Sequence, residues 1–152
     1  SNIVNLDIAF NMCQISKAHK NYNVINGDME LLPFAENSFD LIISSLAFQW
    51  VKELDKFYQS IYNIAKPGAK IIFSTLGPES LKELEISYSN LNKKFPKIKL
   101  NDISYHLKLL QLKGFRNITY IISKRRNWYD SLKSVILSIK KIGAGVRENR
   151  CG

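Results

Sequence analysis

The chain has 152 residues, of which 45% are hydrophobic and 23% are charged, as is usual for one soluble domain with a hydrophobic core. No apolar run approaches the roughly 20 residues that a membrane helix needs, and no signal-peptide pattern opens the sequence. We therefore expect a cytoplasmic protein with no membrane partner. Cys13 and Cys151 are far apart and lack the spacing of a zinc site, so neither a disulfide framework nor a metal site is indicated.

The net charge of +9 is unevenly distributed along the chain. Residues 1–60 carry 4 Lys or Arg and 7 Asp or Glu, a net charge of −3, whereas residues 61–152 carry 18 and 6, a net charge of +12. Such asymmetry indicates an acidic partner for the C-terminal half, for example an acidic protein, a nucleic acid or a membrane surface. The alternative is that coding bias alone produces the abundance of Lys, Asn and Ile.

The first half of the chain alternates apolar strands with helices, which its apolar runs and helical spacings predict. The expected strands are residues 3–7, 22–26, 39–45 and 70–76, and the expected helices are residues 10–20 and 52–65. Leu41-Ile42-Ile43 is an unbroken apolar run, typical of a strand covered on both faces. Lys66-Pro67-Gly68 ends the second helix, because Pro cannot continue a helix and Gly permits the turn.

The second half is expected to be mainly helical. The expected elements are a helix that follows Gly77-Pro78 and runs to about Leu91, a basic loop at 93–101, a helix at 102–113, a strand at 118–123 and a helix at 129–142. Gly114 and Gly143 follow two of these helices as C-cap residues. Alternating strands and helices favour an α/β fold with parallel strands and right-handed crossovers. No linker divides the chain, so we expect one domain over residues 1–152.

The most informative pattern lies in residues 24–45. An apolar strand ends in Gly27-Asp28, the following loop contains Leu32-Pro33-Phe34, and Ser38-Phe39-Asp40 leads into a second strand. This stretch resembles the nucleoside-binding half of class I S-adenosylmethionine (SAM) methyltransferases. The resemblance implies a Rossmann-like α/β sheet and SAM as cosubstrate. The alternative is an unrelated α/β domain with a loop Asp and a buried strand.

The start of this methyltransferase fold has no counterpart in the sequence. The family opens with a strand and a glycine-rich turn that holds the methionine part of SAM through close backbone approach. No Gly-x-Gly motif precedes Asp7, and the chain begins at what resembles the second strand of the family. We therefore expect a partial SAM-dependent methyltransferase domain that lacks the first strand and helix, and that transfers methyl groups poorly by itself.

The resemblance implies SAM contacts at five positions. Asp7, followed by Ile8, corresponds to the acid that binds the ribose hydroxyls, because a carboxylate offers two acceptor oxygens. Asp28 corresponds to the acceptor of the adenine amino group, with Met29 packed on the ring. Ser44 lies near the carboxyl end of the fourth strand of the family, and ligands gather outside such strand ends in this fold. The structural alternatives are a helix N-cap for Asp7 and an Asx turn for Asp28.

The segment Leu46-Ala47-Phe48-Gln49-Trp50 narrows the resemblance to the malonyl-acyl-carrier-protein O-methyltransferases of biotin synthesis. Two further segments, Phe73 to Leu84 and Tyr129 to Ala144, are similar to the same family. The resemblance implies that Gln49 and Trp50 contact the substrate. The alternative is that Trp50 is a buried aromatic residue and Gln49 an amide that caps the next helix.

Lys124-Arg125-Arg126, close to Trp128, forms a basic-aromatic cluster. Arg125 and Arg126 are candidates for contacting malonyl-acyl carrier protein or the phosphate of its pantetheine arm. Nucleic-acid phosphate is another ligand of such clusters, but no recognised nucleic-acid-binding motif accompanies this one. The alternative is a solvated basic edge.

We assign no catalytic side chain and no metal ligand. His19 and His106 lie in predicted helices away from residues 44–50 and are expected at the surface. A carboxylate, with a reference pKa of about 4, is already an ionised nucleophile at pH 7. Methyl transfer to it needs alignment and desolvation rather than a base. Glu30 is expected to point to solvent.

The leading hypothesis is therefore a SAM-dependent methyltransferase that O-methylates the free carboxyl of malonyl-acyl carrier protein in biotin synthesis. A second hypothesis is a methyltransferase of another small molecule, such as a quinone precursor. A third, from a different class, is an inactive truncated remnant that serves only as an interaction module. SAM binding distinguishes the two enzyme hypotheses from the third.

Overall fold

The structure is a computed structural model that describes residues 3–19, 23–90 and 100–141. It divides into two compact units. Unit 1 comprises residues 1–78 and 100–116, and unit 2 comprises residues 79–99 and 117–152. Most of the expected basic loop at 93–101, and the expected C-cap Gly143, lie outside the described residues.

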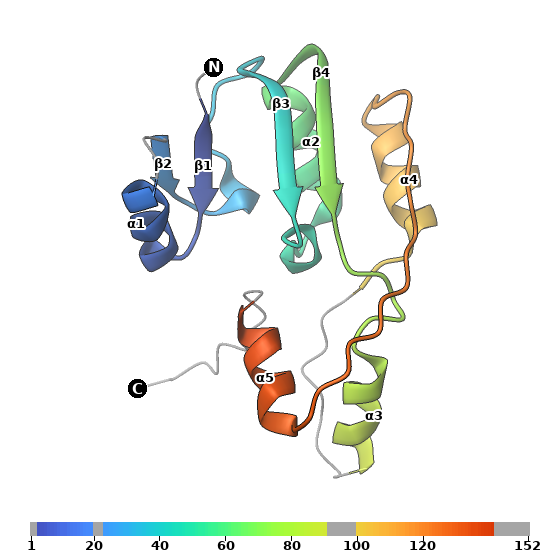
Figure 1. The fold of residues 1–152 in the computed structure, drawn as a ribbon. Coiled ribbons are helices and arrows are strands. Elements are labelled where there is room, and N and C mark those ends of the chain that lie inside the picture. The colour runs from blue at the N-terminus through green and yellow to red at the C-terminus, as the bar shows by residue number, and fades with distance from the viewer. Residues whose placement is uncertain (1–2, 20–22, 91–99, 142–152) are drawn as a thin grey trace, which may run out of the picture. The chain divides into compact units, whose positions relative to one another are not determined.

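The elements of unit 1 follow the predicted alternation of strands and helices (Figure 1). In chain order they are β1 (Val4–Asp7), α1 (Phe10–His19), β2 (Asn23–Asn26), the 3-10 helix η1 (Met29–Leu31), β3 (Phe39–Ser45), the 3-10 helix η2 (Phe48–Trp50), α2 (Leu54–Ile64), β4 (Ala65–Ser74) and α4 (Ile103–Leu112). Unit 2 contributes α3 (Lys82–Asn90) and α5 (Leu132–Lys141). The α/β fold class and the first four predicted strands are confirmed.

The described strands form two parallel pairs (Figure 1). β1 pairs with β2, with Asp7 opposite Asn26, and β3 pairs with β4, with Ser45 opposite Ser74. Parallel pairing is confirmed, but a single sheet was expected, and no ladder joins the two pairs within the described residues. A parallel strand obtains its ladder hydrogen bonds only from a neighbouring strand. Each pair therefore keeps open edges among the described residues.

β4 begins at Ala65, five residues earlier than predicted, and ends at Ser74. Ala65 pairs with Phe39 and Lys70 pairs with Leu41, so residues 66–69 form an irregularity in the ladder. Within it, Gly68 has a φ of +81°, a left-handed conformation that Gly adopts without steric cost. The Lys-Pro-Gly turn therefore follows the end of α2, as predicted, but lies inside an irregular strand.

α2 lies beside the β3–β4 pair (Figure 1) and buries one stripe of apolar side chains. The buried residues of this helix have the predicted helical spacing, and they are Leu54, Phe57, Tyr58, Ile61 and Ile64. Phe48 stacks on Phe73 of β4 with ring centroids 4.4 Å apart and meets Phe57 edge-on at 4.7 Å. Such pairs stabilise a core by about 0.5–1.5 kcal/mol beyond their buried area. An aromatic core thus joins helix and sheet.

The apolar run of β3 is covered on one face only. Leu41, Ile43 and Ile72 are 48%, 67% and 58% exposed. Because successive strand side chains point to opposite faces, Ile42 and its partner Ile71 lie on the other, half-buried face. Coverage of both faces was expected and is wrong for the described residues. The spacing and hydrophobicity of the residues indicate that a strand is suited to burial. They do not indicate whether another element covers it.

α4 packs on α2 through a buried polar contact. The Tyr58 hydroxyl lies 2.7 Å from His106 Nδ1, and both residues are buried. Burial raises the pKa of Tyr58 and lowers the pKa of His106, although Asp102 opposes the shift at the histidine. The protonated phenol therefore donates to a neutral imidazole. The surface position expected for His106 is wrong, because its bond to Tyr58 satisfies a polar group inside the core.

Gly114 ends α4 as the C-cap prediction required. Its φ is +92°, and its N–H donates to the Gln111 carbonyl at 3.0 Å. A Cβ at this position would lie 3.2 Å from the Tyr62 hydroxyl oxygen. The next residue, Phe115, meets the Tyr62 ring edge-on at 5.3 Å. Both backbone conformation and close packing therefore require glycine here.

The strand predicted at 118–123 is wrong. These residues belong to no helix or strand, and Ile121 is 94% exposed. Their β-branched and aromatic composition favours a strand, but a strand needs a neighbour to pair with. None of the described elements provides one. The helix expected at 129–142 begins at Leu132.

Candidate functional site

The carboxyl ends of β1 and β2 bring together the two acids that the sequence singled out. Asp7 is the last residue of β1 and lies opposite Asn26 in β2, and Asp28 follows two residues later. The Gly27 N–H donates to the Asp7 carbonyl at 3.0 Å. A Cβ at Gly27 would lie only 3.0 Å from Leu6 Cδ1, so glycine allows this close approach. Both acids thus lie at one end of a parallel strand pair, as predicted.

Asp7 keeps one carboxylate oxygen available. Its Oδ1 accepts the Ala9 N–H at 2.7 Å in the turn before α1, and Oδ2 has no hydrogen-bond partner among the described residues. The residue is half-buried, and the neighbouring Ile8 is 59% exposed. Asp7 therefore stabilises the turn before α1, a role similar to the helix N-cap that was its structural alternative. Its second oxygen can still accept hydrogen bonds from a ligand.

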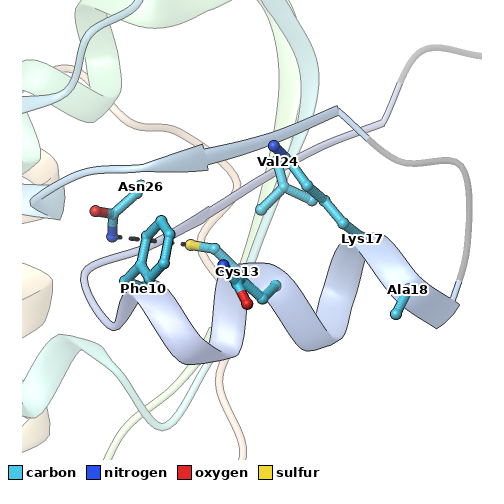
Figure 2. Close-up of a pocket in the computed structure, with 7 residues that line it drawn as sticks. Phe10, Cys13, Lys17, Ala18, Val24 and Asn26 are labelled. Atoms are coloured by element: carbon cyan, nitrogen blue, oxygen red, sulfur yellow. Dashed lines mark hydrogen bonds between the residues drawn. The ribbon is translucent and has the colours of Figure 1, made fainter.

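Asn26, which the sequence analysis missed, fixes the backbone around Asp7. Its Nδ2 donates to the Asp7 carbonyl at 2.9 Å and to the Ile8 carbonyl at 3.0 Å. The buried Cys13 thiol lies 3.4 Å from the same Asp7 carbonyl. Figure 2 shows Asn26 and Cys13 joined across the space between β2 and α1. The available signal was an amide residue at the strand end directly before Gly-Asp.

Asp28 occupies the N-cap of η1. Its Oδ1 accepts the Glu30 N–H at 2.9 Å, the local turn that was the structural alternative for this residue. The side chain is exposed, and its other oxygen has no hydrogen-bond partner among the described residues. Met29 is half-buried beside it. Like Asp7, Asp28 combines a local structural role with one unused acceptor.

Glu30 faces the chain rather than solvent, which corrects the expectation. Its Oε1 accepts the Lys52 N–H at 3.1 Å, and the residue is half-buried. This bond connects the loop after β2 to the residues before α2. A carboxylate accepting a backbone N–H satisfies a donor that would otherwise need water. Glu30 therefore holds the Asp28 loop in place.

A buried amide fixes the segment that follows β3. Gln49 is 7% exposed, its Nε2 donates to the Leu46 carbonyl, and its Oε1 accepts the Thr75 hydroxyl at 3.4 Å. Leu46 has a φ of +51°, and its N–H donates to the Ser74 carbonyl at 3.0 Å. A left-handed conformation costs a residue with a side chain about 1–2 kcal/mol. Gln49 thus holds a strained turn, and it does not cap the next helix, because no side chain caps the start of α2.

The other expected contacts are more accessible. Ser44, in β3, and Trp50, in η2, are half-buried in unit 1. Arg125 and Arg126 are exposed in unit 2 and form no ion pair with a described residue. Substrate contact by Gln49, Trp50 and the two arginines stays a prediction.

Two cavities of the described chain are lined by residues other than the predicted site residues. One of about 470 Å³ is lined by Phe10, Cys13, Gln14, Lys17, Ala18, Val24 and Asn26 (Figure 2). Another of about 220 Å³ is lined by Leu32, Phe34, Glu36, Ser60, Asn63 and Ile64. Neither includes Asp7 or Asp28, so their shared cleft stays a prediction. In the described ranges, no helix has the length and apolarity to cross a bilayer, and no three His, Cys, Asp or Glu side chains cluster to bind a metal.

Comparison with known sequences identifies a family and a group of relatives. Residues 1–73 match the methyltransferase domain family. The chain is 35% identical over 119 residues to malonyl-[acyl-carrier protein] O-methyltransferase 1 of Coxiella burnetii, which covers 78% of this chain and 41% of the relative. It is 29% identical to malonyl-[acyl-carrier protein] O-methyltransferase of Gallionella capsiferriformans, covering 93% of this chain and 52% of the relative. The chain thus spans about half the length of these relatives.

Comparison with solved structures shows the fold. An S-adenosylmethionine-dependent methyltransferase from Mesorhizobium loti superposes with a TM-score of 0.59 at 18% identity, over 75% of this chain and 63% of that one. The phosphoethanolamine N-methyltransferase 2 of Haemonchus contortus, solved with S-adenosylhomocysteine, gives a TM-score of 0.60 at 23% identity, over 76% and 28%. Both describe the same α/β architecture as this chain.

Proposed function

We propose that this protein takes part in methyl transfer from SAM to the free carboxyl of malonyl-acyl carrier protein, because residues 1–73 match the methyltransferase domain family and the chain has the fold of SAM-dependent methyltransferases. The observation that carries the proposal is the pair of acids, Asp7 and Asp28, at the carboxyl ends of two adjacent parallel strands. The names of the relatives, at 28–35% identity over about half their length, support the choice of acceptor.

The two acids suit the two ends of a nucleoside. The unused oxygen of Asp7 accepts hydrogen bonds from the ribose hydroxyls, and that of Asp28 accepts one from the adenine amino group. Met29 packs on the adenine, Ile8 lies beside Asp7, and Ser44 lies near the carboxyl end of β3. Asn26 and Glu30 hold the backbone on which these side chains are mounted. A hydrogen bond to a charged group contributes about 1.5–3 kcal/mol.

Methylation of a carboxylate asks little of the protein beyond alignment. One carboxylate oxygen attacks the methyl carbon, the O–CH3 bond forms, and the S–CH3 bond breaks with its electron pair passing to sulfur. A carboxylate and a sulfonium become a neutral ester and a neutral thioether, and no proton moves. Neutralisation of both charges favours a site from which water is excluded.

The proposal is tested under single-turnover conditions, with the purified chain in excess over SAM that carries a labelled methyl group. Malonyl-acyl carrier protein is the acceptor, and acetyl-acyl carrier protein is the matched control, since it lacks the terminal carboxylate. We expect base-labile label on the malonyl form alone. Equal labelling of both forms would show that the malonyl carboxyl is not the acceptor, and no labelling of either would contradict the proposal that this chain takes part in methyl transfer.

A further inference from the structure

Unit 2 presents an exposed extended segment that the methyl-transfer proposal does not use. Every residue from Thr119 to Ser131 is exposed, and Ile121 and Trp128 reach 94% and 90%. Among the described residues, no hydrogen bond joins the backbone of 117–130 to another residue. Large apolar side chains gain about 25 cal/mol for each Å² removed from water. Exposed together, they are typical of an interaction site.

Cations accompany these apolar side chains. Lys124, Arg125 and Arg126 are consecutive, and Asp130 is the one acid between residues 117 and 131. Lys82 and, more weakly, Lys124 hold the pKa of Glu79 below its ordinary value, so Lys124 lies close to a carboxylate of this chain. The two arginines have no described acidic partner. Trp and Arg are the side chains that most often dominate protein interfaces.

We propose that this region, called the Ile121–Trp128 surface and consisting of Ile121, Ile122, Lys124, Arg125, Arg126 and Trp128, is the docking surface for an acidic carrier protein. The proposal rests on the proposed function, which supplies such a partner. The cations meet carboxylates of the carrier and steer its approach. Ile121 and Trp128 become buried against an apolar patch of the carrier that these carboxylates surround.

The side chains favour a protein over other polyanions. Isoleucine offers neither hydrogen bonds nor an aromatic face to a nucleic acid, whose single strands are bound mainly by stacking and basic grooves. At an anionic membrane each cation contributes about 1 kcal/mol, so three give only a weak attachment. An acidic protein surface with an apolar centre uses both components of the Ile121–Trp128 surface.

Docking is measured as the dissociation constant between the chain and fluorescently labelled malonyl-acyl carrier protein, without SAM, by anisotropy. The triple variant Lys124→Gln, Arg125→Gln, Arg126→Gln should weaken binding at least about tenfold and flatten its salt dependence. The matched control is Lys52→Gln, Lys70→Gln, Lys108→Gln, which removes the same charge from exposed positions of unit 1. It should change the constant by less than about twofold.

The apolar side chains of the Ile121–Trp128 surface are tested with a variant and a matched control. Ile121→Ser should weaken binding about tenfold, whereas Leu112→Ser, at a residue 68% exposed in unit 1, should leave it unchanged. Circular dichroism confirms that each variant folds. Equal losses in the two triple variants, no loss with Ile121→Ser, or tighter binding to poly-uridine RNA or phosphatidylserine vesicles than to the carrier would each overturn the proposal.

Different results would contradict the proposed methyl transfer and the proposed docking surface. A malonyl thioester without the carrier protein reports methyl transfer alone, and Ile121→Ser should not alter its rate while lowering transfer to the carrier. If the small thioester is never methylated, the proposed function fails, yet the anisotropy series still decides the docking surface. If it is methylated and the carrier binds equally to wild type and variants, the docking surface is wrong.

Discussion

At the scale of residues, the Tyr58–His106 bond places a titratable imidazole in the core of unit 1. The groups that face the imidazole are the Tyr58 phenol and the Asp102 carboxylate at the start of α4. Burial dominates, so the pKa of His106 lies below its ordinary value of about 6.5. A protonated imidazole could not accept the phenol proton, so acid weakens the contact between α2 and α4.

Acid should therefore lower the stability of the chain before its carboxylates titrate. Well above a pH of about 6.5 both folded and unfolded states hold neutral His106, and its contribution is complete. Below that pH the unfolded state takes up a proton that the folded state resists, so the free energy of unfolding falls by up to about 1.4 kcal/mol per pH unit until the folded pKa is reached. Urea unfolding between pH 7.5 and 5.5 measures this fall.

His106→Asn is the control for that titration, because its amide oxygen can accept the phenol proton but does not ionise. The stability of this variant should change less between pH 7.5 and 5.5 than that of the wild type. Parallel profiles for the two proteins would assign the pH dependence to other groups.

At the candidate site, the role of a residue was predictable only where a suitable side chain stands at a position that the sequence pattern itself locates, such as the end of a strand. Asp7 and Asp28 follow apolar strands, and the carboxyl ends of paired parallel strands meet, so their common location could be read from the sequence. The roles of Asn26 and Glu30 could not, because each depends on a backbone partner brought close by folding. The same holds for Gln49, whose amide bridges Leu46 to Thr75.

At the scale of elements, the contact between α2 and the end of α4 depends on Gly114. Ala at this position must adopt a left-handed backbone and place its Cβ 3.2 Å from the Tyr62 hydroxyl oxygen. Gly114→Ala should therefore lower the free energy of unfolding by about 1–2 kcal/mol. The urea midpoint, at unchanged slope, measures the loss.

Gly77 provides the comparison for Gly114. No atom lies within 4 Å of a Cβ built there, so Gly77→Ala should change the free energy of unfolding by less than about 0.5 kcal/mol. If both variants lost equal stability, the cost would come from glycine replacement in general rather than from the packing of α4 against Tyr62.

Helices were more predictable than strands because their hydrogen bonds are local. The stripe of α2 and the C-cap of α4 follow from spacing and a single glycine, and both are confirmed. Strands need partners, which the local sequence does not specify. Residues 118–123 have strand composition but no neighbour among the described elements, and the apolar run of β3 has a cover on one face only.

At the scale of the whole molecule, the family pattern predicted more than periodicity did. Residues 24–45 indicated a methyltransferase fold, and the family match over residues 1–73 and the solved structures bear this out. The single sheet expected from that pattern is divided into β1–β2 and β3–β4 in the described chain. Alternation along the sequence predicts parallel pairs, but it does not determine which pairs adjoin.

The central claim is that Asp7 and Asp28 bind the nucleoside of SAM, and titration of SAM into the 152-residue chain by calorimetry tests it most directly. Asp7→Asn retains an acceptor for the Ala9 N–H but loses the charge. We expect the wild type to bind and Asp7→Asn to bind about 10- to 150-fold more weakly, the equivalent of 1.5–3 kcal/mol. Glu36→Gln, at an exposed acid of the next loop, should bind as the wild type does. A wild type without measurable binding, or equal affinity in Asp7→Asn, would contradict the claim.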